Sequence, residues 1–110
     1  MKKYVPQRGD IVFLDFAPTK GHEQGGRRPA LVVSPRAYNS KSGLMLACPI
    51  TSKEKGYPFE VAVVIGDRSG VILVDQIRCI DWKARKAEEM DSLTKETLAD
   101  VIEKLGLLVN

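Results

Sequence analysis

The sequence predicts a mainly β domain that forms a closed or nearly closed antiparallel barrel and ends in one helix. Short apolar runs rich in β-branched residues alternate with polar, glycine-containing turns, and the apolar period becomes helical near the C-terminus. The chain has 110 residues, of which 44% are hydrophobic and 28% charged. This composition is that of an ordinary globular domain and excludes disordered and collagen-like proteins. We therefore expect one domain over residues 1–110.

The first half of the chain places a long polar segment between two expected strands. The first strand covers residues 10–16, where β-branched and aromatic residues follow an Arg-Gly pair. A polar loop with three glycines then runs from Ala17 to Arg28. A loop of this length inside a compact domain commonly carries function. The second strand is expected over residues 29–34, because a proline at the start of a strand removes no interior ladder bond.

Further short strands follow in the second half. A polar loop at 51–58 and a turn at 66–70 separate them. The strands are expected over residues 44–50, 59–65, 71–74 and 77–80.

The C-terminal segment has helical spacing. Its apolar residues are Leu98, Val101, Ile102, Leu105, Leu108 and Val109. Thr94 is the expected N-cap of this helix, and Leu93 and Leu98 are spaced as a hydrophobic staple. The apolar stripe can pack on the sheet or on a partner subunit, and the sequence leaves both possibilities open.

Charge is distributed unevenly along the chain. The net charge is +3, but the first 55 residues carry ten basic and four acidic side chains, whereas the last 55 carry seven and ten. Such an asymmetry marks either an anion-binding face or a solvated surface, and charge alone favours neither.

The sequence gives little support for a metal site or a membrane segment. Cys48 and Cys79 are far apart with no CxxC motif, and His22 is the single histidine, so a zinc site or a disulfide framework is not expected. Apolar stretches fall short of the roughly 18 residues needed to cross a bilayer. The N-terminus lacks the apolar segment of a signal peptide, so we expect a cytoplasmic protein.

Two segments at strand ends carry the candidate catalytic groups. Arg28 lies before Pro29, which fixes the exit geometry, and a planar guanidinium can clamp a phosphate. Its neighbour Arg27 is expected to be solvated or to touch a flanking phosphate. Thr51 follows a strand and precedes a lysine-rich loop with Tyr57. The alternatives are a solvated strand entry and an ordinary ST-turn.

Other polar residues are weaker candidates. Glu23 and His22 lie in the first polar loop and are the residues there that can move protons near neutral pH. Asp75 and Gln76 stand between two apolar runs, where they can read base edges or cap a strand end.

Three fragments, taken together, resemble a known family. They are RGDIVFLDFAPTKGHEQGGRRPALVVSP, then PIT with a later KGYPFEV, then GVILVDQIRCIDW before the terminal helix. They resemble the MazF/PemK/Kid family of toxin endoribonucleases over nearly the whole chain, with the order and spacing of the MazF branch. The resemblance implies an SH3-like small barrel, a homodimer, and a type II toxin that cleaves single-stranded RNA such as mRNA without a metal ion or cofactor. It also implies a MazE-like antitoxin whose acidic C-terminal segment covers the RNA site.

The resemblance also assigns roles to residues. The family's catalytic arginine falls on Arg28, its hydroxyl residue on Thr51 and its loop glutamate on Glu23. An arginine that shares the work in the Kid branch corresponds here to Leu73, so that role does not carry over. Residues in matching positions to grip phosphates or read bases are Lys20, Gln24, Lys55, Asp75 and Gln76.

Two other classes of small barrel remain as alternatives. One is a non-enzymatic, CcdB-like toxin that poisons DNA gyrase, and the pairing of Arg28 with Thr51 argues against it. The other is an SH3-like binding module, which is disfavoured because few aromatic rings are available to line a proline-recognition groove.

Overall fold

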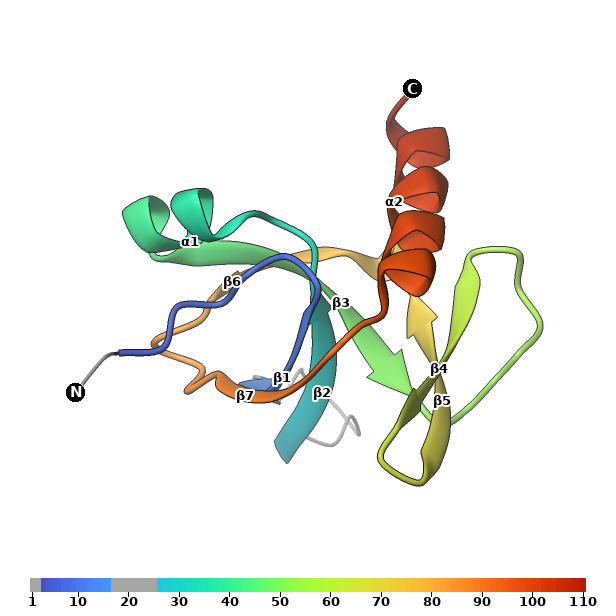
Figure 1. Cartoon of the computed structure of the whole chain (residues 1–110), viewed down its shortest axis with the longest axis horizontal. Coiled ribbons are helices and arrows are strands. Elements are labelled where there is room, and N and C mark those ends of the chain that lie inside the picture. The colour runs from blue at the N-terminus through green and yellow to red at the C-terminus, as the bar shows by residue number, and fades with distance from the viewer. Residues whose placement is uncertain (1–2, 17–25) are drawn as a thin grey trace, which may run out of the picture.

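The computed structural model describes residues 3–16 and 26–110, which form seven strands, two α-helices and a short 3-10 helix (Figure 1). In chain order these are β1 (Asp10–Phe16), β2 (Gly26–Val32), α1 (Arg36–Ser42), β3 (Leu44–Thr51), β4 (Glu60–Ile65), β5 (Arg68–Leu73), η1 (Val74–Gln76), β6 (Arg78–Asp81), β7 (Glu88–Ser92) and α2 (Lys95–Val109). Among these residues, no helix is long and apolar enough to cross a membrane.

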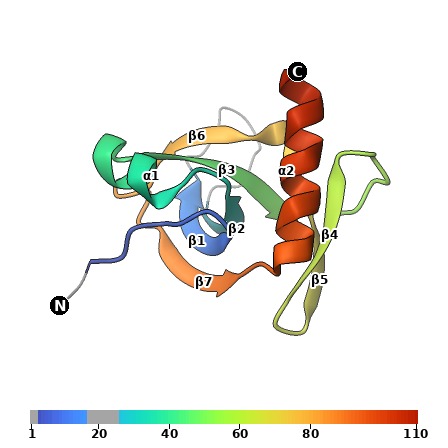
Figure 2. The same cartoon turned by 45° about the horizontal axis from the view of Figure 1, so that its top comes forward.

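Strand β3 is the centre of the sheet. The described strands run in the order β4-β5-β3-β2-β1-β7, and β6 pairs with β3 away from this path. The first half of β3 pairs with β6, whereas its last two residues pair with β5. Because one strand serves two neighbours on the same side, the antiparallel sheet curls into a half-barrel with α2 against one side (Figure 2). The predicted mainly β architecture with a C-terminal helix is confirmed.

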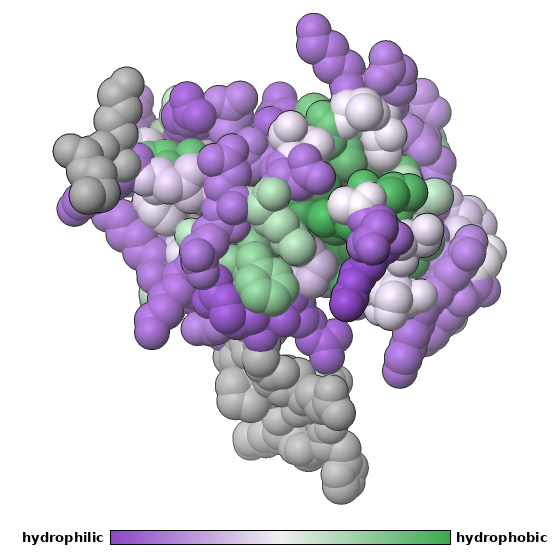
Figure 3. All heavy atoms as spheres, turned by 60° about the horizontal axis from the view of Figure 1, so that its bottom comes forward, coloured by the Kyte–Doolittle hydropathy of each residue, from purple (hydrophilic) through white to green (hydrophobic). Residues whose placement is uncertain are grey.

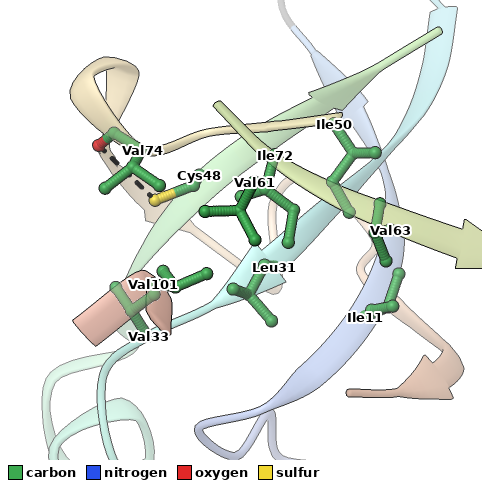
Figure 4. Close-up of a cluster of buried hydrophobic side chains, with 10 residues drawn as sticks. All are labelled: Ile11, Leu31, Val33, Cys48, Ile50, Val61, Val63, Ile72, Val74 and Val101. Atoms are coloured by element: carbon green, nitrogen blue, oxygen red, sulfur yellow. Dashed lines mark hydrogen bonds between the residues drawn. The ribbon is translucent and has the colours of Figure 1, made fainter. Parts of the chain in front are cut away.

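The sheet separates two apolar clusters because strand side chains alternate between its faces. The helix-side core, shown in Figure 4, consists of Ile11, Leu31, Val33, Cys48, Ile50, Val61, Val63, Ile72, Val74 and Val101. The barrel core consists of Val12, Leu14, Ala30, Val32, Met45, Ala47, Ile80 and Trp82. Strand β2 contributes alternate residues to the two cores, so it is buried on both faces over its second half.

The C-terminal helix uses its apolar residues in two ways. Thr94 is the N-cap, as predicted, and its side chain accepts a hydrogen bond from the Thr97 N–H. Val101 is fully buried in the helix-side core, and Leu98 and Leu105 pack against it. Four apolar side chains of α2 instead remain exposed, namely Ile102, Leu107, Leu108 and Val109. One face of the helix therefore packs on the sheet and leaves a second apolar face uncovered by this chain.

Some boundaries and elements differ from the sequence predictions. Strand β2 begins at Gly26 rather than at residue 29, because its first residues pair with β1. Helix α1 was not predicted, since its residues are mostly polar, yet Asn39 on it is fully buried and donates to the carbonyl of Pro6. Strand β7 was also missed, because every residue in it is exposed and only its pairing with β1 defines it.

Candidate active site

Arg28 lies within strand β2 rather than at the end of a loop. Its Cα is paired with that of Leu14 on β1, and its side chain is exposed. Strand alternation places Arg28 on the same face as Ala30 and Val32, two residues of the barrel core. No hydrogen bond or ion pair joins Arg28 to another residue that the structure describes. The guanidinium is therefore carried by a strand at the rim of the barrel core, exposed and unpaired within residues 3–16 and 26–110.

Thr51 ends strand β3 at the same rim. The ladder between β2 and β3 runs from Val32↔Ala47 to Ala30↔Pro49. Arg28 and Thr51 each stand two residues beyond the last of these pairs, and both lie on the face of Ala30 and Pro49. Continuing the register places Arg28 opposite Thr51. Two adjacent strands thus bring an arginine and a hydroxyl to one edge of the sheet.

Gly70 on β5 allows the close approach that sets the position of Thr51. Strand β5 pairs with β3 through Thr51↔Val71. A Cβ atom at Gly70 would lie 2.8 Å from the carbonyl oxygen of Thr51, closer than real Cβ contacts. Any side chain at this position therefore has to push β5 away from the end of β3. Packing of β5 against β3 therefore requires glycine at position 70, and the sequence alone does not reveal this requirement.

Arg27 has a different environment from its neighbour, and the expectation that it is solvated is wrong. Its Nη1 donates to Asp15 Oδ1 at 2.9 Å, and its Nη2 donates to the carbonyls of Phe13 and Lys86 and to Glu88 Oε1. The guanidinium carbon also lies 5.2 Å from the centre of the Phe13 ring. These contacts connect β2 to β1, to the segment before β7 and to the first residue of β7. Arg27 is a structural residue in this chain.

The loop between β3 and β4 carries Lys55 and Tyr57, both exposed. It starts with a hydrogen bond from the Lys53 N–H to Thr51 Oγ1 at 3.2 Å. Its other end is held by the carboxylate of Glu60, which accepts hydrogen bonds from the backbone of the loop. Sequence reasoning missed Glu60. The available sequence signal is a glutamate that follows a glycine in a polar loop, three to five residues after the segment Lys55-Gly56-Tyr57.

The other predicted residues fall into two groups. Asp75 and Gln76 are exposed in η1, beside Val74, whose carbonyl oxygen lies 3.8 Å from Cys48 Sγ. Cys48 belongs to the helix-side core, so η1 lies on the opposite face of β3 from Thr51, and no described contact joins these residues to Arg28. The remaining predicted residues lie outside the described part of the chain, namely Glu23, Lys20, Gln24 and His22.

Titration and metal binding add two observations. Burial, followed by the nearby charge of Asp75, raises the pKa of Cys48 to about 12, so this thiol stays protonated and unreactive near neutral pH. Burial and the hydrogen bond to Asp10 raise the pKa of Tyr4, which keeps its phenol neutral. In residues 3–16 and 26–110, no group of three or more histidine, cysteine or carboxylate side chains is arranged to hold a metal ion.

A basic hollow lies elsewhere on the described surface. Its volume is about 470 Å³, and Trp82 and Tyr4 line it together with three lysines, Lys3, Lys83 and Lys86. Trp82 is nonetheless a packing residue, because it is buried and its Nε1 donates to the carbonyl of Asn39. None of the predicted catalytic residues lines this hollow.

A curled antiparallel sheet with one C-terminal helix and an Arg/Thr pair at its rim defines a small class of proteins, and comparison identifies the class. A family model described as "PemK-like, MazF-like toxin of type II toxin-antitoxin system" matches residues 7–109. The chain belongs to this family.

Individual relatives agree with the family assignment. The chain is similar to the Escherichia coli K12 protein named "Endoribonuclease toxin MazF", at 45% identity over 109 residues, covering 99% of this chain and 98% of that protein. It is 35% identical to the Bacillus subtilis protein named "Endoribonuclease EndoA", covering 94% and 93% of the two chains.

Solved structures show the same fold. The crystal structure of MazF from Deinococcus radiodurans matches with a TM-score of 0.87 and 54% identity, covering 97% of this chain and 98% of that one. A MazE-MazF complex from the same organism matches with a TM-score of 0.88 and 54% identity, covering 97% of each chain.

Proposed function

We propose that this chain is an endoribonuclease, the toxin of a type II toxin–antitoxin system, and that it cleaves single-stranded RNA at the Arg28/Thr51 edge. The observation that supports this most is the placement of Arg28 and Thr51 on one face of two adjacent strands. The named activity of the E. coli and B. subtilis relatives supports the same class of reaction. The substrate we propose is mRNA, so that cleavage stops translation and growth.

The chemistry is an internal transfer at phosphorus. The ribose 2′-oxygen attacks the adjacent phosphorus, a bond to that oxygen forms, and the bond to the 5′-oxygen of the next nucleotide breaks. The 2′-hydroxyl proton passes to a base, and the leaving 5′-oxygen takes up a proton. The products are a 2′,3′-cyclic phosphate and a 5′-hydroxyl, and the step consumes no water.

Each catalytic residue has a role that suits its chemistry. Arg28 stabilises the charge that builds on the phosphate oxygens, because a planar guanidinium donates two parallel hydrogen bonds. A guanidinium holds its protons tightly, so it is a poor general acid. Thr51 donates its hydroxyl hydrogen to a phosphate oxygen and orients it. Glu23, on the loop between β1 and β2, is our candidate for the base that accepts the 2′-hydroxyl proton.

Binding of the RNA strand uses the loops around this edge. Lys55 pairs with a backbone phosphate, and an unstacked base stacks on the exposed ring of Tyr57. We place further contacts to phosphates and bases at Lys20 and Gln24. We also place contacts at Asp75 and Gln76 in η1, which lies on the other face of β3 and would meet a strand that extends beyond the Arg28/Thr51 edge. The excess of basic residues in the first half of the chain favours binding of the negatively charged RNA backbone.

The proposed partners are an antitoxin and a second copy of the chain. The antitoxin is MazE-like and covers the RNA site with an acidic, extended segment, in keeping with the MazE-MazF complexes among the similar structures. On the face shown in Figure 3, apolar side chains gather in one area that hydrophilic ones border, which suits a partner segment with both apolar and polar side chains. The exposed apolar residues of α2 suit contact with a second copy in a homodimer. We expect the protein to act in the cytoplasm.

A cleavage experiment in chelator tests the function. Purified protein is incubated with a long single-stranded RNA in excess EDTA, and the cut ends are sequenced and their termini identified. We expect cleavage at a short recurring sequence that leaves a 2′,3′-cyclic phosphate, because Arg28 supplies the charge that a metal ion would otherwise supply. Activity that requires added magnesium would overturn the mechanism. Intact RNA together with inhibition of DNA gyrase would place the chain in the target-binding class of toxins.

A further inference from the structure

The carboxylate of Glu60, the first residue of β4, is the hydrogen-bonding centre of the loop over residues 52–59. Its Oε1 accepts from the backbone N–H groups of Gly56 at 2.9 Å, Lys55 at 3.2 Å and Tyr57 at 3.3 Å, and its Oε2 accepts from Lys55 at 3.1 Å. The Glu60 N–H in turn donates to the carbonyl oxygen of Tyr57 at 3.1 Å. One half-buried side chain therefore holds three successive peptide groups.

Three successive N–H groups that point at one anion form a nest, and a nest requires alternating backbone conformations. Gly56, at the middle of the three residues, has φ +80°, which an L side chain rarely adopts. Hydrogen bonds to a charged acceptor are about twice as strong as bonds between neutral groups. The carboxylate therefore stabilises a loop shape that packing does not, because residues 52–58 are all exposed.

The nest is one of two anchors for this loop. At the other end Thr51 Oγ1 accepts from the Lys53 N–H, so the loop leaves directly from a candidate catalytic side chain. Lys55 and Tyr57 stand between the two anchors, and the Tyr57 side chain is 54% exposed. Their positions relative to Thr51 are therefore fixed mainly by Glu60.

We propose that Glu60 is a positioning residue that presents Lys55 and Tyr57 to the RNA strand and so helps to set where the strand is cut. This inference rests on the proposed function. Both carboxylate oxygens of Glu60 accept hydrogen bonds from the loop backbone, so its proposed role is to hold the loop rather than to bind the RNA directly. It acts through the backbone of residues 55–57.

Electrostatic repulsion alone and the positioning role predict opposite effects of Glu60 on RNA affinity. Removing a negative charge beside a basic RNA-binding loop should tighten binding, since fewer anions repel the phosphates. If Glu60 instead holds the loop in its binding shape, removing it should weaken binding, because the loop must then be ordered at the expense of binding free energy. Glu54 provides the matched control, since it is exposed in the same loop and has no described hydrogen-bond partner.

The test compares Glu60→Ala, Glu60→Gln and Glu54→Gln in the full chain. Three measurements are made: the Kd for a 2′-O-methyl RNA that cannot be cleaved, the cut sites and KM on a long RNA, and amide hydrogen exchange at residues 55–57. For Glu60→Ala we expect Kd and KM to rise about tenfold with kcat changed less than ~3-fold, dispersed cut sites and faster exchange at the three amides. Glu60→Gln should be intermediate, because it keeps one acceptor oxygen, and Glu54→Gln should bind RNA slightly more tightly.

The outcomes distinguish the role of Glu60 from the proposed ribonuclease activity. The positioning role would be overturned if hydrogen exchange at residues 55–57 were unchanged in Glu60→Ala. It would also be overturned if exchange were faster in Glu60→Ala but its Kd and cut sites were the same as those of Glu54→Gln. A wild-type protein that binds the RNA analogue without cleaving RNA would overturn the proposed activity, and the Kd series would still decide the role of Glu60. A wild-type protein that neither binds nor cleaves would overturn both. Melting curves of all variants confirm that the fold is retained.

Discussion

Arg27 and Arg28 are neighbours on β2, yet the two faces of the strand give them opposite environments. The Arg27 side chain is 27% exposed, is paired with Asp15 and Glu88, and donates to two backbone carbonyls. Arg28 is exposed beside the barrel core and has no partner among the described residues. Strand alternation alone produces this difference, since consecutive side chains point to opposite faces. Two identical side chains therefore have different surroundings: Arg27 holds strands together, whereas Arg28, our proposed catalytic residue, is exposed.

The largest expected effect is on catalysis at the Arg28 face. Arg28→Ala should lower the single-turnover cleavage rate by about 10²–10³, because it removes a preorganised charge that stabilises the transition state. Its free energy of unfolding should change by less than ~1 kcal/mol, since no described contact is lost. Arg28→Lys should recover little activity, because an ammonium lacks the planar fork. Near-normal cleavage by a folded Arg28→Ala protein would contradict the proposed catalytic role of Arg28.

Arg27→Ala should produce the opposite result. We expect a loss of about 2–3 kcal/mol in the free energy of unfolding, measured by denaturant titration, because charged hydrogen bonds and the contact with Phe13 are removed together. Cleavage at saturating RNA and low temperature should fall far less than in Arg28→Ala. The control is Glu88→Gln, which removes one partner whose side chain is 72% exposed and should cost less than ~0.5 kcal/mol. Equal stability of Arg27→Ala and wild type would show that the hydrogen bonds and ion pairs of Arg27 do not contribute to the stability of the fold.

A smaller effect is expected at Gly70, which supports the Arg28/Thr51 face from behind. Gly70→Ala should cost about 1–2 kcal/mol and reduce cleavage roughly tenfold, because the new Cβ displaces β5 from the Thr51 carbonyl. Gly106→Ala is the matched control. It lies in α2 with nothing within 4 Å of an added Cβ, so it should stabilise the chain by about 0.5–1 kcal/mol. Melting curves and single-turnover rates of both variants provide the measurement, and similar behaviour of the two would rule out a close-approach role for Gly70.

The sequence by itself determined the order of most elements and the chemical class of the site. The strand over residues 10–16 and the N-cap at Thr94 agree with the structure, because alternation and capping are local properties of the chain. The sequence did not reveal α1 or β7. Helix α1 is secured by the burial of the polar Asn39, and β7 by pairing with an edge that is distant in the chain. Neither contact produces a periodic pattern of apolar residues in the sequence, so neither element can be recognised from the sequence.

The site shows the same division. Arginine, threonine and lysine beside strand ends indicated phosphate chemistry from the sequence alone, because side-chain type fixes what a residue can bind. Which arginine is available, how Thr51 stands relative to Arg28 and why Glu60 holds the adjacent loop were decided only by the tertiary structure. Each depends on strand register or on a backbone conformation, and both are set when distant segments pair.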